Sequence, residues 1–331
     1  MDDISAFTKV AERCLAFYDL PYTRIDFIRH NENATFYVEL AARRRPVVLR
    51  LHQPAISGLA QEHRTPQALE SVLEWMESIA ENTDLTVQKP VRSKDGSLVV
   101  AVEDDKGAVI HCSISEWIDG DVLDQEHGRA ADHVRAFGAV VAKLQNYSSS
   151  WSPPAGFCRP CYGAGFLSGV ADRLRLGFAT APFDKSDFVP ISRAIDKITS
   201  LVESAKETSD QWGLVHMDLQ GGNILVHNNE VRLIDFTLCG WGSYLFESGM
   251  AISCLQAKWH PCFLSGYKSL RPLKTSAFSH LEAGAILGIL AAYSYHIANP
   301  KSHEWIVPRV QVVAHDYCGK FLADQRFLLD M

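Results

Sequence analysis

Residues 213–235 read GLVHMDLQGGNILVHNNEVRLID, and this segment decides how the rest of the sequence is interpreted. Its two ends are apolar and typical of β-strands, and His216, Asp218, Asn223 and Asp235 lie between or directly after them. A carboxylate on a loop after a strand can orient a hydroxyl group and accept its proton, and Asp218 suits this role. Asn223 and Asp235 carry the oxygen ligands that Mg²⁺ prefers. The segment therefore favours phosphoryl transfer, which needs little other help from the protein.

The spacing within this segment predicts its local structure. Residues 214–215 are expected to form a first strand, residues 224–226 a second and residues 231–234 a third, with a turn at Asn228-Asn229. Gly221-Gly222 allows a tight backbone between the first two strands. A hairpin with incidental polar residues would explain one Asp and one Asn, but not the whole ordered set. We therefore expect the side chains at 218, 223 and 235 to converge on one cleft between two lobes.

Composition limits the class of protein. The chain has 331 residues, of which 47% are hydrophobic and 21% charged, as expected for one large or two ordinary folded soluble domains. A net charge of −7 argues against nucleic acid as a partner. The start of the chain lacks the pattern of a secretory signal, and the apolar stretch 283–292 is too short to span a membrane. We therefore expect a cytoplasmic protein with reduced cysteines and a buried helix over residues 283–292.

The first third of the chain is rich in strand signals after an amphipathic opening helix. Residues 35–40 and 46–51 predict one hairpin across the basic turn 42–45, and residues 97–103 and 108–115 predict a second across 104–107. A helix is expected between the hairpins at 65–82, with Pro66 near its start. The remainder is mainly helical, with helical patterns at 130–147, 165–178, 190–207, 244–259 and 276–297.

The order His216-x-Asp218-x-x-x-x-Asn223, followed by Ile234-Asp235-Phe236, resembles the catalytic and metal-binding segments of the aminoglycoside phosphotransferase and choline kinase superfamily, relatives of protein kinases. Met217 lies where protein kinases have Arg. The resemblance extends from Asn31 to about Tyr295 and is nearest to the homoserine-kinase-like bacterial branch.

This resemblance implies an α+β, two-lobed protein-kinase-like fold. It places a small antiparallel β-rich nucleotide-binding lobe at residues 1–115 and a hinge at 116–120. A larger, mainly α-helical lobe at 121–331 would hold the catalytic loop and the acceptor pocket. His216 is expected to brace the loop, and Glu247, where the family usually has Asp, is expected to support structure.

The resemblance also assigns site residues. Asp218 would be the catalytic base, while Asn223 and Asp235 would bind Mg²⁺. The turn at 31–36 would cover the phosphates of ATP or another nucleoside triphosphate, with Asn33 contributing, although the turn contains no glycine.

Further nucleotide contacts are implied on the following strands. Arg50 replaces the family's phosphate-binding Lys, a change that keeps the charge but not the shape. Its acidic partner would be Glu70 or Glu74, which lie about one helical turn apart, and Glu74 is taken as the site residue. The backbone at Glu116 and Ile118 would bind the adenine.

The resulting prediction is an ATP- and Mg²⁺-dependent phosphotransferase that moves the γ-phosphate to a hydroxyl of a small molecule. The acceptor stays open among aminoglycosides, homoserine and amino alcohols, and the sequence indicates no oligomeric state. A Ser/Thr protein kinase of the same fold is the first alternative, although no activation segment ending in Ala-Pro-Glu follows Asp235. A catalytically weak nucleotide-binding regulator is the second, motivated by Arg50 and the glycine-free turn.

Overall fold

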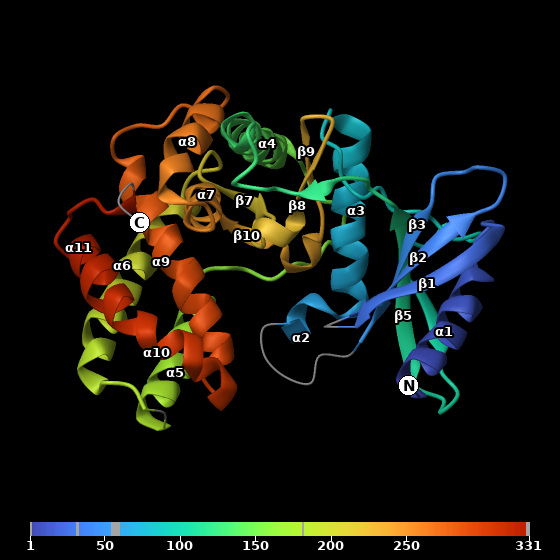
Figure 1. The fold of residues 1–331 in the computed structure, drawn as a ribbon, viewed down its shortest axis with the longest axis horizontal. Helices are drawn as coiled ribbons and strands as arrows, with labels where there is room; N and C mark the ends of the chain where they lie inside the picture. Colours follow the sequence, from blue (N-terminus) through green and yellow to red (C-terminus); the bar gives the residue numbers. More distant parts are fainter. Residues whose placement is uncertain (1, 31–32, 54–59, 181, 329–331) are drawn as a thin grey trace. The chain divides into compact units, whose positions relative to one another are not determined.

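A computed structural model describes residues 2–30, 33–53, 60–180 and 182–328 (Figure 1). The chain divides into two compact units. Unit 1 comprises Met1–Gly120, Ser152–Arg159 and Arg232–Leu238. Unit 2 comprises Asp121–Trp151, Pro160–Val231 and Cys239–Met331.

A five-stranded antiparallel sheet forms the centre of unit 1, in the order β1-β2-β3-β5-β4. Both predicted hairpins are confirmed, since β2 pairs with β3 and β4 with β5. The edge strand β1 was not predicted. The bounds are β1 Tyr22–His30, β2 Asn33–Leu40, β3 Val47–His52, β4 Val100–Glu103 and β5 Val109–Glu116.

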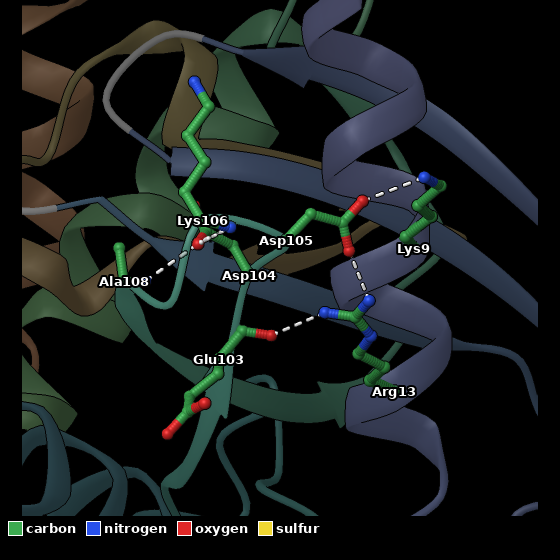
Figure 2. Close-up of polar contacts among 7 residues, drawn as sticks. All are labelled: Lys9, Arg13, Glu103, Asp104, Asp105, Lys106 and Ala108. Carbon is green, nitrogen blue, oxygen red and sulfur yellow. Dashed lines mark hydrogen bonds and ion pairs between the residues drawn. The ribbon is translucent and has the colours of Figure 1, made fainter.

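Helix α1 (Asp2–Leu15) covers one face of this sheet and buries Val10, Ala11 and Cys14 in a core with the strands (Figure 1). Figure 2 shows how its exposed side contacts the turn between β4 and β5: Lys9 and Arg13 pair with Asp105. Such exposed ion pairs contribute about 0–1 kcal/mol each, so the apolar face carries most of the helix's attachment.

The turn itself is closed by Asp104, as Figure 2 also shows. Its carboxylate accepts hydrogen bonds from the N–H groups of Lys106 and Ala108, each at 2.8 Å. Gly107 follows with a φ of +81°, a conformation that glycine adopts without steric cost. This turn chemistry confirms the hairpin expected across residues 104–107.

Helix α3 (Pro66–Asn82) is the second long helix of unit 1 and follows the short α2 (Ala60–His63). Thr65 caps its start by accepting a hydrogen bond from the N–H of Ala68 at 3.1 Å, and Pro66 occupies the first turn. The predicted helix at 65–82 is therefore confirmed, with its apolar face buried.

Unit 2 is mainly helical, as predicted. The expected helix over 244–259 instead ends at Ser253, and a new helix begins beside Pro261, a residue favoured in the first turn. The helices are α4 Ala130–Ser150, α5 Ala164–Thr180, α6 Phe188–Lys206, α7 Tyr244–Ser253, α8 His260–Lys268, α9 Ala277–His296, α10 His303–Val312 and α11 Gly319–Leu322, with a π-helical turn at Val313–Cys318.

Glycines allow two pairs of these helices to pack backbone to backbone. A Cβ atom on Gly138 of α4 would lie 2.1 Å from the carbonyl oxygen of Phe263 in α8. A Cβ atom on Gly249 of α7 would lie 1.9 Å from the carbonyl oxygen of Leu281 in α9. These contacts place α7, which supplies a site residue, firmly against the core of unit 2.

Helix α9 is the single helix of the described chain long and apolar enough to cross a membrane by length and composition. Two observations identify it as a core helix instead. Sixty-seven per cent of its apolar window is buried within the protein, and its side chains Ile286, Leu287 and Leu290 belong to the core that α5 and α6 share. The buried helix expected over 283–292 is therefore confirmed.

The strands that carry residues 213–235 form two small sheets. Strand β7 (Trp212–Val215) pairs antiparallel with β10 (Gly240–Ser243), and the three-stranded sheet has the order β6-β8-β9. Its strands are β6 Asp121–Val122, β8 Ile224–His227 and β9 Glu230–Leu233, the last two residues of β9 belonging to unit 1. The strands predicted at 214–215, 224–226 and 231–234 are confirmed.

Candidate active site

Asp218 and Asn223 face each other on the loop between β7 and β8. The Asn223 side-chain amide donates to the backbone oxygen of Asp218 at 2.9 Å and to its carboxylate Oδ2 at 2.6 Å. Both partners accept hydrogen bonds only, so the NH₂ group must point at Asp218. The carbonyl oxygen Oδ1 of Asn223 therefore points away from Asp218, as a cation ligand requires.

The buried carboxylate of Glu247, on α7, holds this loop through hydrogen bonds to its backbone. Its Oε1 accepts hydrogen bonds from the N–H groups of His216 and Met217, the latter at 3.2 Å. Met217 has a φ of +62°, a left-handed conformation that costs a residue with a side chain about 1–3 kcal/mol. The two hydrogen bonds thus hold a strained turn directly before Asp218.

His216 has the structural role expected from the sequence. Its side chain is fully buried, and its Nδ1 accepts a hydrogen bond from the N–H of Asp218 at 3.2 Å. The second oxygen of Glu247 accepts from Gln145 of α4 at 2.7 Å. The position of Asp218 therefore depends on a buried set of hydrogen bonds.

The pKa of Glu247 lies within the physiological pH range. Burial raises its pKa to about 7, against the opposing effect of the hydrogen bonds from Gln145, Met217 and His216. The folded protein therefore binds a proton more tightly here than the unfolded chain, whose Glu side chains have a pKa near 4.5.

This raised pKa predicts a pH dependence of stability. Because the folded state holds the extra proton, the contribution of Glu247 to the free energy of unfolding is full below pH 4.5 and is lost as the pH rises towards 7. Chemical denaturation at several pH values in this window, comparing the parent with Glu247→Gln, isolates the effect. We expect the difference in unfolding free energy between the two proteins to change with pH; a constant difference would contradict the prediction.

Asp235 lies on a braced turn of unit 1. Its φ is +64°, its Oδ1 accepts a hydrogen bond from the Thr237 hydroxyl at 2.7 Å, and its Oδ2 lies 3.5 Å from the guanidinium of Arg29. The turn is held by buried Arg159, which donates to the carbonyl oxygens of Thr237 at 2.6 Å and Ala68 at 2.9 Å. The Asp235 carboxylate therefore contacts Thr237 and Arg29, and its turn is held by Arg159.

Arg50 lies in the middle of the sheet of unit 1, on β3. It lies opposite Thr35 of β2, and its guanidinium donates to Gln88 Oε1 at 2.9 Å. Within the described chain no ion pair joins Arg50 to Glu70 or Glu74, so the pairing with Glu74 stays a prediction. Burial and the nearby charge of Glu70 raise the pKa of Glu74.

The surroundings of Arg50 are electropositive. His52, two residues along β3, is bonded through Nε2 to the Ser113 hydroxyl at 2.8 Å. Burial first, and then the charges of Arg50 and Arg64, lower the pKa of His52 to about 3. The ring is therefore neutral at pH 7, and the positive charge that remains suits the phosphates of a nucleotide.

The predicted phosphate-covering turn is described only in part. Asn31 and Glu32 lie outside the described residues. Asn33 begins β2 and lies opposite His52 of β3 in the antiparallel register. Its assignment to phosphate binding stays a prediction.

The proposed adenine-binding segment begins where β5 ends. The N–H groups of Glu116 and Trp117 donate to the carbonyl oxygens of Lys89 and Pro46 at 2.8 and 3.0 Å. Ile118 is buried, and its N–H makes no hydrogen bond to any other residue of the described chain. That N–H is the kind of donor that an adenine ring would need.

The structure brings together Asp218 with Asn223 in unit 2, and Asp235 with Arg29 in unit 1. Sequence reasoning did not identify Arg29, Gln88 or Arg159. Arg29 would have followed from recognising β1 as a strand beside β2. The other two contact the site from distant positions in the chain and carry no local signal.

Comparisons with known proteins identify the family of the chain. The sequence pattern of the phosphotransferase enzyme family matches residues 25–272, three quarters of the chain. The chain belongs to the phosphotransferase enzyme family, which confirms the predicted class of enzyme and the predicted resemblance. An uncharacterized protein from Synechocystis sp. is 24% identical over 258 residues, which cover 74% of this chain and 67% of the relative.

Solved structures of small-molecule kinases share the fold. A microcompartment-associated aminopropanol kinase has a TM-score of 0.76 at 24% identity, covering 96% of this chain and 98% of its own. An amicoumacin kinase, solved in complex with AMP-PNP, Ca²⁺ and Ami, has a TM-score of 0.73 at 15% identity, covering 96% of this chain and 93% of its own. The predicted two-lobed, kinase-like α+β fold class is therefore confirmed.

Proposed function

We propose that this protein is an ATP- and Mg²⁺-dependent kinase that phosphorylates a hydroxyl group of a small amine-bearing alcohol. The observation that carries the proposal is the contact between Asn223 and Asp218. Its geometry fixes the carboxylate and at the same time leaves a carbonyl oxygen for a cation. The choice of a small molecule as the acceptor rests on the kinases that share the fold, which are named for aminopropanol and amicoumacin.

Each residue of the site has a role in this proposal. Asp218 orients the acceptor hydroxyl and accepts its proton, while Asn223 and Asp235 supply the oxygen ligands that fit Mg²⁺. The bound metal and nucleotide supply the γ-phosphoryl group and the charge that neutralises it. The remaining residues position the nucleotide. Arg50 and Asn33 contact its phosphates, and Glu74 is the acidic partner of Arg50. The backbone of Glu116 and Ile118 contacts the adenine base.

The predicted organisation is part of the proposal. Residues 1–115 form the nucleotide-binding lobe, 116–120 the hinge and 121–331 the lobe that binds the acceptor. A cytoplasmic location follows from the need for ATP. The fold relatives favour a small molecule over a protein as the acceptor, and a braced base argues against a mere nucleotide-binding regulator.

A screen of hydroxylated amines tests the proposal. Purified protein, ATP and Mg²⁺ are incubated with separate pools of amino alcohols, hydroxyl amino acids and aminoglycosides, and phosphorylated products are measured by mass spectrometry. We expect a product in one of these pools, formed by the parent but not by Asp218→Ala. Tight ATP binding without product from any pool would favour the regulator.

Replacing Asp235 should weaken nucleotide binding only when Mg²⁺ is present. Loss of residues that support a metal ligand typically lowers metal affinity about 10- to 100-fold, and loss of a ligand itself should cost at least as much. Calorimetric titration of AMP-PNP into Asp235→Ala, with Mg²⁺ and with EDTA, measures this. The matched control is Asp172→Ala, an exposed Asp of α5; equal Mg²⁺-dependent affinity in the two variants would remove the metal role of Asp235.

A further inference from the structure

A cavity lies in unit 2, away from the Asp218 loop. Its volume is about 410 Å³, and it opens beside the residues that precede β7, whereas Asp218 follows β7. No residue assigned to the catalytic machinery lines it. The walls come from the end of α4, residues 210–211, the end of α8, the connection 270–276 and the first turn of α9.

Arg271 gives this cavity a positive charge, and no ion pair within the described residues involves it. The guanidinium donates to Asn146 Oδ1 at 3.0 Å and to the backbone oxygen of Asp210 at 2.5 Å, and it stacks over the Tyr244 ring at 4.7 Å. All of these partners are neutral, and among the described residues no carboxylate forms an ion pair with Arg271. A half-buried Arg without a direct ion pair is well suited to a carboxylate or a phosphate.

The rest of the lining fixes the chemical class of ligand further. Lys274 adds a second positive charge, and Asp210 is the one acidic residue in the lining. Burial lowers the pKa of His280, which therefore stays neutral at pH 7. The apolar part of the wall is formed by Leu245, Leu270, Pro272, Leu273 and Ala277. A ligand with an apolar body and an anionic head matches both parts.

A buried chain of hydrogen bonds connects this cavity to the catalytic loop. Tyr267, in the cavity wall, donates to Gln145 Oε1 at 2.6 Å, and Gln145 donates to Glu247 Oε2 at 2.7 Å. The other oxygen of Glu247 accepts the N–H groups of His216 and Met217. All members of this chain are buried, so it links the cavity wall to the loop without an intervening solvent-exposed group.

We propose that this cavity binds a small amphiphilic anion at Arg271 and that its occupancy loosens the catalytic loop through Tyr267, Gln145 and Glu247. The charge of Arg271 lowers the pKa of both Glu247 and Tyr267. A bound anion offsets that charge, so Glu247 becomes protonated at a higher pH and holds the two N–H groups less strongly. The effect on turnover rests on the proposed function; ligand binding and loop opening do not.

Binding is tested with octanoate, octyl phosphate and octylamine, which share an apolar body and differ in the head group. Calorimetry should show that both anions bind and that octylamine does not. Arg271→Gln should weaken anion binding at least about 10-fold, the effect of losing a charge-assisted hydrogen bond, while Arg271→Lys retains it. Lys274→Gln, at an exposed position, guards against misfolding of the first variant and should weaken binding less. Equal affinity for octylamine, or no binding of either anion, overturns the proposal.

The connection to the loop is tested by hydrogen exchange. Octanoate should speed amide exchange in the peptide that contains His216 and Met217. Tyr267→Phe removes one hydroxyl of the chain and leaves Arg271 in place, so octanoate should still bind it but change loop exchange less. Unchanged exchange in the octanoate-bound parent, or an equal response in Tyr267→Phe, would contradict the regulatory role whatever reaction the enzyme catalyses.

Discussion

Replacing Asp218 with Ala should lower the turnover rate by about 10²- to 10⁴-fold, the usual effect of losing a positioned general base. Asn223 fixes the Asp218 carboxylate, which is nevertheless partly exposed and so accessible to an acceptor hydroxyl. Nucleotide affinity should change little, because Asp218 acts on the acceptor hydroxyl rather than on the phosphates. Steady-state rates and AMP-PNP titrations on the same preparation measure both quantities.

The control for this variant is again Asp172→Ala, which removes an exposed carboxylate of the same unit. It should leave the rate unchanged. If Asp218→Ala kept more than about a tenth of the parent rate, Asp218 would not be the general base of the reaction. Loss of nucleotide binding together with rate would indicate instead that Asp218 supports the fold of the loop.

Replacing Glu247 with Ala should destabilise the protein by about 2 kcal/mol or more, because it leaves the N–H groups of His216 and Met217 without their acceptor. Each buried group left in this way costs about 1–3 kcal/mol. The strained turn at Met217 would also lose its support. Denaturant unfolding gives the free energy, and the rate of the folded fraction should fall as well.

One further variant separates shape from charge at this position. Glu247→Gln keeps one oxygen for the loop but presents an NH₂ group to the NH₂ group of Gln145, so it should be intermediate in stability. Glu203→Ala, on the exposed side of α6, is the matched control and should lie within about 0.5 kcal/mol of the parent. Parent-like stability in Glu247→Ala would show that the carboxylate does not support the loop.

Much of the fold could be predicted because its elements carry local signals. The hairpins had turn residues between alternating strands, and the helix α3 had a Thr-Pro start. Strand β1 lacked such a signal because most of its residues are at least partly exposed and charged residues interrupt its apolar positions. The break between α7 and α8 was missed because the apolar pattern continues across it, with Leu255 buried in between.

The candidate site, too, was predictable from the sequence only where its residues carry a local signal. The spacing of Asp218 and Asn223 predicted that the two side chains lie close together, because both are on one short loop between two strands; their hydrogen bond was not predicted. The partner of Arg50 was not predictable from sequence. Gln88 reaches it from a segment 38 residues away, and no charge pattern distinguishes that Gln from others. The same holds for Arg159, whose contacts join three distant segments of unit 1.

A crystal structure with Mg²⁺ and AMP-PNP is the most direct test of the central claim that Asn223 and Asp235 serve one metal–nucleotide site beside Asp218. We expect Asn223 Oδ1 and a carboxylate oxygen of Asp235 to bind Mg²⁺ at about 2.0–2.1 Å, with the Asp218 carboxylate facing the terminal phosphate. Mg²⁺ held by other residues, or Asp235 turned away from the nucleotide, would contradict the account.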